Sequence, residues 1–501
     1  MFFCLKHENA GKIESHLWFF KGLCTYLNPK MCQLIDAGSI PLQHSISRMF
    51  MYMDTYPTVG GCCGEIEVIF PHKPDGVLEL AVVAAQYVEY KLSHYLDKAM
   101  ESLFSFISVL PGAFSMFRWD AIQGGPLTKF FDGLNKSGHT CFEANMYLAE
   151  DRIMCLEILI KRNEAWILKY IPGCKALTDP PDNLLTLMKQ RRRWINGSMF
   201  AAFYCVMNFC KVTNSSHSFC RVTLIYIFFT YYITQMMLTL VLVGSFYATF
   251  NILLGSFAPS DGTVKLYSWT SLADGLYVLA HFFLIIVSTT VNLGDAGLFF
   301  KFFVNVFGVY LMAMLILAAL HLTKTLSLAA TFALIFGVGF GISYVLPILI
   351  NFRRVSVVKY VFGAITLLYL TPTYIIIMVI YAICNIHDIS WGNRPDTAEA
   401  KQESAKQRRT EEVFKAYRTK ALLLWIILNT VISMLVIDLS SSDDGQESEF
   451  IIFFAIFSAF VIWVRLCLAL INTCIACAQI AHINSRTRKI KSQKAKEIAD
   501  A

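Results

Sequence analysis

Charged residues are scarce in this sequence, and their scarcity excludes a purely soluble protein. Only 16% of the 501 residues are charged and 56% are hydrophobic, whereas a soluble domain has about 25% charged and roughly 45–50% apolar residues. The apolar surplus is unevenly distributed. Charge occurs throughout residues 1–219, and from Val222 onward the chain contains apolar runs as long as the ~20 residues that cross a bilayer. We therefore predict a soluble first part and a membrane-embedded second part.

Cysteine is absent from the polar segments 258–265 and 440–449, which we place on the outer, non-cytosolic side of the membrane. The fifteen cysteines lie instead in the first part and in the apolar runs, so they indicate buried or cytosolic thiols rather than a disulfide framework. Cys474 and Cys477 form a C-x-x-C pair inside an apolar run, with no second pair, which favours core packing. The first residues also lack the basic start and apolar core of a secretory signal peptide.

The net charge of +7 could suggest a nucleic-acid partner. The basic residues, however, cluster beside the apolar runs, as they do in the cytosolic loops of membrane proteins. We therefore expect these basic residues to lie beside a lipid bilayer, and we expect the protein to bind no nucleic acid.

The soluble part alternates strand patterns with helix patterns. Residues 31–35 and 65–70 are typical of buried strands, and residues 78–106 predict a helix because no Gly or Pro interrupts their apolar spacing. Further helices are predicted over 143–160 and 183–210. This alternation predicts an α/β domain over residues 1–182. Residues 183–219 mix apolar positions with basic ones, so we expect them to lie on the membrane surface.

Seven apolar runs are candidates to cross the membrane: 222–245, 276–291, 302–320, 326–350, 361–384, 421–437 and 450–477. Basic residues on both sides of the last two runs predict a hairpin with cytosolic ends, and Arg191–Arg193 place the soluble domain in the cytosol too. Two cytosolic ends need an even number of crossings, so one of the first five runs fails to span. We choose 361–384, where Pro372 could break the helix. Seven crossings with another topology remain the alternative.

This topology divides the chain into consecutive segments. Transmembrane helices occupy 220–384, a cytosolic loop 385–420, a transmembrane hairpin 421–480 and a basic cytosolic tail 481–501. Arg465 lies within the last apolar run, where an arginine at the bilayer centre costs about 2.5–3.5 kcal/mol. It should therefore face a partner, a wet lumen or another subunit, unless it reaches the membrane surface.

Three polar groups carry chemistry. Asp36 directly follows the strand at 31–35, where ligands bind in α/β sheets, and a carboxylate there suits a Mg²⁺ or Mn²⁺ that also holds phosphates, although Asp-x-Gly is also an ordinary turn. Glu150 and Asp151 begin a helix, which alone indicates a cap. The sequence QRRRW at 190–194 offers cations for a diphosphate and an aromatic platform for a sugar, beyond what a juxtamembrane basic patch explains.

Together these groups resemble the processive inverting glycosyltransferases that make cellulose, hyaluronan and chitin, and most closely the chitin synthases. Eight phrases occur in that family's order: KIESHLWFF at 12–20, LIDAG at 34–38, GCCGEI at 61–66, QYVEY at 86–90, VLPGA at 109–113, AEDR at 149–152, QRRRW at 190–194 and CNIHDISWGNR at 384–394. The resemblance covers nearly the whole chain. It implies an α/β domain of the GT-A glycosyltransferase type followed by an α-helical transmembrane bundle.

The resemblance also implies residue roles. Asp36 would bind the divalent metal on the UDP diphosphate, Lys12 would lie near the nucleotide, and Asp151 would be the general base. The remaining roles concern the acceptor, the gate and a structural motif: Gln190, Arg193, Trp194 and Glu150 would bind substrate and acceptor; Val109, Leu110, Pro111, Gly112 and Ala113 would gate the channel mouth; Trp391, Gly392 and Arg394 match a Trp-Gly-Thr-Arg motif with Asn393 in place of Thr.

The implied partners are UDP-GlcNAc, a growing chitin chain, the lipid bilayer and a second copy in a homodimer, at the plasma membrane. The family's domain begins well before the phrase at Lys12, with strands that hold uracil and ribose. We therefore expect this chain to correspond to an N-terminally truncated synthase that is weakly active or inactive alone. The alternative is a membrane scaffold subunit without chemistry of its own.

Overall fold

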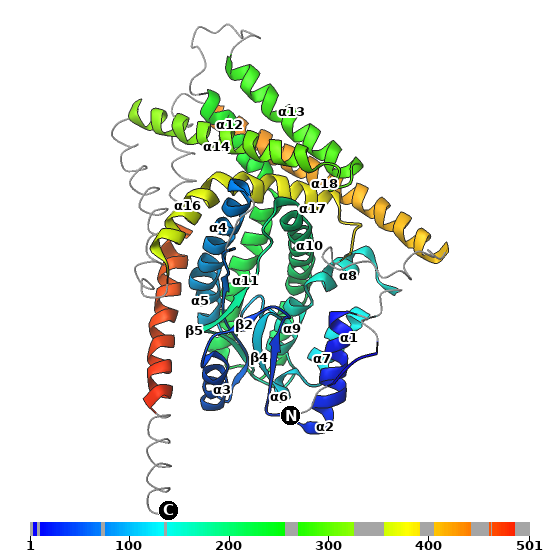
Figure 1. Ribbon diagram of the computed structural model, residues 1–501, viewed down its shortest axis with the longest axis vertical. Helices are drawn as coiled ribbons and strands as arrows, with labels where there is room; N and C mark the ends of the chain where they lie inside the picture. The colour runs from blue at the N-terminus through cyan, green and yellow to red at the C-terminus, as the bar shows by residue number, and fades with distance from the viewer. Residues whose placement is uncertain are drawn as a thin grey trace, which may run out of the picture.

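Five strands form one mixed sheet in the order β1-β4-β3-β5-β2. They are β1 Met31–Ile35, β2 Ile40–Pro41, β3 Val59–Val68, β4 Phe114–Arg118 and β5 Ile167–Thr178. Only β3 and β5 pair in parallel; the other neighbours are antiparallel. The computed structural model describes residues 4–7, 11–71, 76–134, 138–255, 269–324, 355–390, 405–441, 460–461 and 463–485. The predicted α/β class is confirmed by this sheet and the helices around it (Figure 1).

The strand predicted at 31–35 has the bounds of β1, whereas the strand predicted at 65–70 is only the end of β3. Its first half contains glycines, which weaken the sequence signal for a strand. In the fold these glycines are needed for close packing. A Cβ on Gly61 would lie 2.7 Å from a methyl group of Leu110, and one on Gly64 would lie 2.5 Å from the carbonyl oxygen of Cys174.

The helix predicted at 78–106 forms as a nearly continuous rod of α4 Val77–Leu92, the π-helical turn η2 Ser93–Lys98 and α5 Ala99–Leu103. Lys91 ties the rod to the sheet. Its ammonium group is 1% exposed and forms ion pairs with Glu65 and, at 2.8 Å, with Glu67 of β3. This anchor fixes the end of α4, which carries Glu89 and Tyr90.

Short helices complete the soluble part: α1 Lys12–Leu17, η1 Trp18–Cys24, α2 Thr25–Leu27, α3 Ser45–Thr55, α6 Trp119–Ile122, α7 Gly125–Phe131, η3 Asp132–Leu134, α8 Cys141–Met146, η5 Tyr147–Ala149 and α9 Glu150–Leu159. Thr140 and Glu143 form a capping box at the start of α8. This box and the turn η5 set the position at which α9 begins, and therefore the positions of Glu150 and Asp151.

The helix predicted at 183–210 is α10 Leu184–Asn208, which is followed by η6 Phe209–Asn214. Asn183 caps it by accepting a hydrogen bond from the amide of Thr186 at 2.9 Å. Gly197 allows α10 to approach η5, since a Cβ there would lie 3.0 Å from that of Ala149. Its position at a membrane surface stays a prediction.

Among the residues that the structure describes, six helices are long and apolar enough to cross a membrane: Phe219–Leu240, Thr270–Thr290, Gly297–Leu317, Val357–Cys384, Arg409–Leu439 and Trp463–Ser485. In the fold they belong to α11 Phe219–Leu240, α13 Trp269–Thr290, α14 Gly297–Lys324, the combined α16 Val357–Pro372, η8 Thr373–Ile377 and α17 Met378–Cys384, α18 Ala405–Ser441, and the 463–485 helix; α12 Leu242–Gly255 is shorter. The predicted run 326–350 lies outside the described residues, and 450–477 lies partly outside them.

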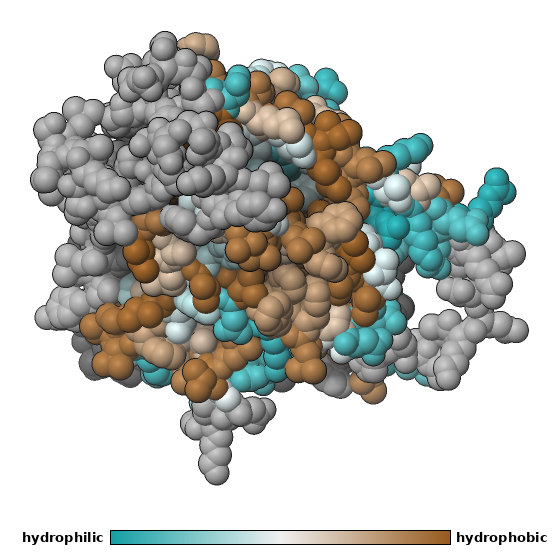
Figure 2. Space-filling model, turned by 90° about the horizontal axis from the view of Figure 1, so that it is seen from above, coloured by the Kyte–Doolittle hydropathy of each residue, from teal (hydrophilic) through white to brown (hydrophobic). Residues whose placement is uncertain are grey.

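These helices present apolar side chains on their outer surface. Figure 2 shows brown residues over much of the face formed where α13, α14 and α18 gather in Figure 1. Phe282 of α13, Ile316 of α14 and Leu424 of α18 are 58%, 58% and 69% exposed. So large an apolar surface requires a nonaqueous environment, as the sequence predicts.

The prediction that Pro372 breaks the helix in the run 361–384 is wrong. The chain passes from α16 through the π-helical turn η8 into α17 without leaving the helical path. Proline has no backbone N–H to donate, so one helical hydrogen bond is missing at this position. The wider π-helical turn keeps the chain helical without that bond. This helix is nevertheless unlike the other five, because 72% of its most apolar window is buried, and Gly363 packs against the carbonyl oxygen of Ala84 in α4.

Arg465 faces a partner residue within the same chain, which is one of the predicted alternatives. Its guanidinium forms an ion pair with Asp97 of η2. On the same helix, the side-chain oxygen of Gln479 accepts a hydrogen bond from Tyr52 of α3 at 2.8 Å. The 463–485 helix therefore lies along the soluble domain (red in Figure 1).

Candidate active site

The end of strand β1 meets the loop that precedes β4. Ile35 pairs with Phe114, so the next residue, Asp36, lies beside Ala113, and its amide donates a 3.4 Å hydrogen bond to the Ala113 carbonyl. The loop 109–113 that was predicted as a gate therefore adjoins the backbone of Asp36, the predicted metal ligand. Leu110 anchors this loop in the core, where it is fully buried and its amide contacts the Cys155 sulfur at 3.1 Å.

Asp151 lies in the first turn of α9, directly across from the same loop. The amide of Gly112 donates a hydrogen bond of 3.0 Å to Oδ2 of Asp151. The ammonium group of Lys12, on α1, lies 3.5 Å from that oxygen and 2.9 Å from Oε1 of Glu150. The structure thus brings together residues more than 130 positions apart in the sequence.

Burial makes the charges of this cluster strongly interdependent. Burial raises the pKa of Glu150, against the opposing effect of Lys12. Burial alone would lower the pKa of Lys12, but the carboxylates of Asp151 and Glu150 outweigh it, so the pKa is raised. His16 lies one turn along α1 from Lys12. Burial and the charge of Lys12 lower its pKa to about 4.

The predicted acceptor residues lie on α10. Trp194 is half-buried, and its ring stacks on that of Tyr90 with centroids 6.5 Å apart and planes at 28°. Gln190 and Arg193 are also half-buried, and Oε1 of Gln190 has no hydrogen-bond partner among the described residues. Because Gly197 packs against Ala149, this part of α10 lies close to the start of α9.

Comparisons with known proteins show what the chain is similar to. Residues 1–209 match the model of a chitin synthase-like glycosyltransferase domain. Residues 1–209 are therefore a glycosyltransferase domain of the chitin synthase type. It is 34% identical to "Chitin synthase C" of Aspergillus oryzae over 90% of this chain and 55% of the relative, and 36% identical to "Chitin synthase I" of Metarhizium acridum over 79% and 47%. "Chitin synthase 1" of Gibberella zeae is 31% identical over 92% and 59%. The chain spans about half the length of the curated relatives it matches.

The phrase QRRRW also contains two arginines whose polar contacts tie α10 to other parts of the fold. Arg191 forms a two-fold hydrogen-bonded ion pair with Glu89, at 2.5 and 2.8 Å. Arg192 donates 2.6 Å hydrogen bonds to the carbonyl oxygens of Asp388 and Ser390. No sequence pattern indicated these partners, which lie 102, 196 and 198 residues away.

The predicted motif residues Trp391, Gly392 and Arg394 lie outside the described residues. The chain leading to them is held in place as far as Ser390, where Arg192 binds it. Arg192 therefore has a structural partner that the sequence analysis missed.

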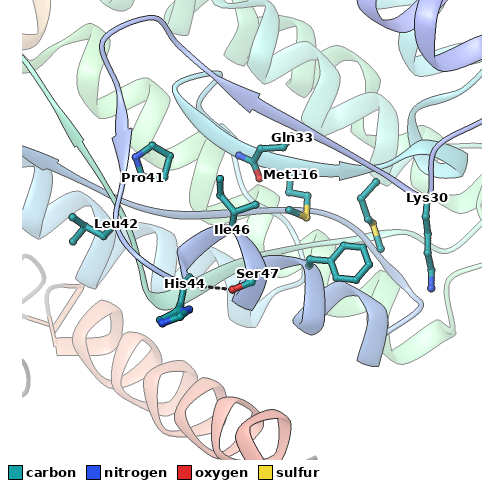
Figure 3. Close-up of a pocket in the computed structure, with 10 residues that line it drawn as sticks. Lys30, Gln33, Pro41, Leu42, His44, Ile46, Ser47 and Met116 are labelled. Atoms are coloured by element: carbon teal, nitrogen blue, oxygen red, sulfur yellow. Dashed lines mark hydrogen bonds between the residues drawn. The ribbon is translucent and has the colours of Figure 1, made fainter. Parts of the chain in front are cut away.

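A separate cavity of about 720 Å³ opens between β1, β2 and α3. Figure 3 shows Gln33, His44 and Ser47 among its lining residues, and none of the ten residues that line it is a predicted site residue. The candidate active site is thus defined by the contacts around Asp151 rather than by this cavity.

Proposed function

We propose that this chain transfers N-acetylglucosamine from UDP-GlcNAc to the 4-hydroxyl of a growing β-1,4-linked chitin chain. The observation that carries the proposal is the continuous contact from Asp36 through Ala113 and Gly112 to Asp151. This contact supports a site in which Asp36 would hold the metal–diphosphate and Asp151 would act as the general base, as one inverting transfer requires.

In this mechanism Asp151 takes the proton from the acceptor 4-hydroxyl. The oxygen attacks the anomeric carbon of the donor, the bond to the diphosphate breaks, and UDP leaves with the electron pair. A sugar hydroxyl, like water with a pKa near 15.7, is a poor nucleophile, and a base within hydrogen-bond reach accelerates such a step by about 10²–10⁴. A single displacement needs one base, so Asp151 suffices.

The neighbouring residues orient this base and bind the substrates. Gly112 and Lys12 contact the same oxygen of Asp151, Oδ2, and the acceptor would approach Oδ1. Trp194 would support the terminal sugar, with Gln190 and Arg193 toward the diphosphate. Fixed cations at a departing diphosphate supply the largest share of catalysis in many enzymes.

A Mg²⁺ or Mn²⁺ ion fits the donor set at Asp36. Mg²⁺ is usually bound by one or two carboxylates together with substrate phosphates and water. The described residues contain no group of three or more His, Cys, Asp or Glu side chains that could hold a metal. The proposed ion would be shared between Asp36 and the diphosphate of the nucleotide. When bound, the ion would neutralise charge on the leaving diphosphate.

The apolar helices support a further part of the proposal, export of the polymer through the membrane. A polysaccharide is too polar to cross lipid, so the chain that makes it benefits from a protein path beside the site. We propose the plasma membrane as the location, with the catalytic domain in the cytosol, and a homodimer as the assembly.

The test is polymer synthesis from radiolabelled UDP-GlcNAc by membranes that contain the chain. Asp151→Asn should reduce incorporation by about 10²-fold or more. Asp132→Asn is the matched control, because Asp132 is half-exposed and pairs with Lys129 on the surface. Unchanged synthesis in Asp151→Asn would refute the enzyme. A wild-type chain that makes no polymer but raises the output of a complete synthase would favour a scaffold subunit.

A further inference from the structure

Arg191 joins the soluble domain, α10 and the membrane helix at one point. Its guanidinium is 7% exposed and pairs with both carboxylate oxygens of Glu89, at the end of α4. Its Cζ atom lies 4.7 Å from the ring centroid of Trp194 and 5.4 Å from that of Tyr374. Tyr374 belongs to η8, the π-helical turn that follows Pro372.

This arrangement restrains the indole of Trp194 from two directions. The cation of Arg191 lies against the indole, and the ring of Tyr90 stacks on it. Neither restraint moves independently, because Glu89 and Tyr90 are consecutive residues of α4, which Lys91 anchors to the sheet. A bidentate carboxylate–guanidinium pair fixes orientation as well as distance.

We propose that Glu89 is a positioning residue that sets the Trp194 indole for the acceptor sugar by acting through Arg191. The proposal rests on the proposed function, in which Trp194 supports the terminal sugar. Tyr374 extends the same contact to the helix Val357–Cys384, so the acceptor platform is built jointly by the catalytic domain and the membrane part.

The size of the effect depends on how far the Trp194 indole is displaced. Misplacement of a binding group by about 1 Å can cost up to about a hundredfold. Glu89→Gln preserves the shape of the side chain but removes the charge that orients Arg191. It should therefore weaken acceptor binding while leaving every predicted substrate-contacting residue intact.

The test is a double-mutant cycle on the binding of chitotetraose to the full chain in detergent. We expect Glu89→Gln to raise the Kd roughly tenfold, and Trp194→Ala to raise it at least as much. The double variant should bind no more weakly than Trp194→Ala alone, because residues that act through one another are not additive. Glu79→Gln is the matched control on α4, since Glu79 pairs only loosely with Lys301, at 3.7 Å.

The outcomes separate the two proposals. Equal binding by Glu89→Gln and wild type, or additive losses in the double variant, overturns the positioning role and leaves the proposed function standing. A wild-type chain that does not bind chitotetraose overturns the proposed function, and the positioning role with it. If Glu89→Gln does not fold, Arg191→Lys takes its place in the cycle, since lysine keeps the charge but cannot form the bidentate pair.

Discussion

The backbone amide of Gly112 donates a 3.0 Å hydrogen bond to the carboxylate of Asp151. A residue of the VLPGA loop is thus hydrogen-bonded directly to the proposed base, while the next residue, Ala113, contacts Asp36. The loop that resembles a gate is therefore also the link between the proposed metal carboxylate and the proposed base. Any movement of this loop would change the surroundings of both groups together.

The first prediction concerns the space at Gly112. A Cβ at this position would lie 2.7 Å from Nζ of Lys12 and 3.3 Å from Oδ2 of Asp151. Gly112→Ala should displace both groups and lower chitin synthesis by up to about a hundredfold, measured from UDP-GlcNAc at equal protein. Gly125→Ala is the control, because nothing lies within 4 Å of a Cβ there. Equal activity of the two variants would contradict a direct link between loop and base.

The second prediction concerns the tether at Arg192. Its side chain is 2% exposed and binds the carbonyl oxygens of Asp388 and Ser390. Arg192→Met should lower the free energy of unfolding by about 1–3 kcal/mol, because the hydrogen bonds from the guanidinium to the two carbonyl groups are lost. It should also speed hydrogen exchange of the amides in residues 385–390.

The control for this tether is Arg162→Met, at an exposed turn. It should leave both the unfolding free energy and the exchange of residues 385–390 unchanged. Exchange that is equally slow in Arg192→Met would show that other contacts hold this segment.

The sequence predicted the strand β1, the long helix that begins with α4 and the start of α9, because each has a clear apolar period or a polar residue at its boundary. It missed half of β3, where glycines hide the strand pattern but allow the sheet to pack. It also misjudged Pro372, since only the fold can provide the π-helical turn that absorbs a proline.

The sequence predicted which residues belong to the candidate site but did not predict which of them contact one another. The resemblance to chitin synthases pointed to Lys12, Asp36 and Asp151 as site residues. The structure adds that Lys12 forms ion pairs with the acidic residues 150 and 151. The partners of Arg191 and Arg192 depend on side-chain direction across the interface between α10 and its neighbours. No local spacing encodes that direction, so these partners cannot be inferred from the sequence.

The third prediction concerns the break between α11 and α12. Asn429 of α18 accepts a 2.8 Å hydrogen bond from the Gly244 amide and donates a 3.0 Å bond to the Leu240 carbonyl. Backbone groups freed at a helix break must find partners when water is absent. Asn429→Leu should therefore lower stability by between about 0.6 and 3 kcal/mol, measured by thermal unfolding in detergent. Thr430→Leu, the exposed neighbour, should have little effect; equal losses would point to the helix surface instead.

The fourth prediction concerns His16, whose pKa is lowered to about 4 by burial and by Lys12. Its unfolded value is near 6.5, so between these two pH values the unfolded chain binds more protons than the folded one. The stability that neutral His16 contributes is therefore complete above about pH 6.5 and is lost as the pH falls toward 4. His16→Gln should make unfolding free energy fall less steeply between pH 6.5 and 4, by at most about 1.4 kcal/mol per pH unit. Denaturant titrations at several pH values check this, with Ser15→Ala as the non-titrating control. Identical slopes for wild type and His16→Gln would mean that the imidazole remains accessible to protons in the fold.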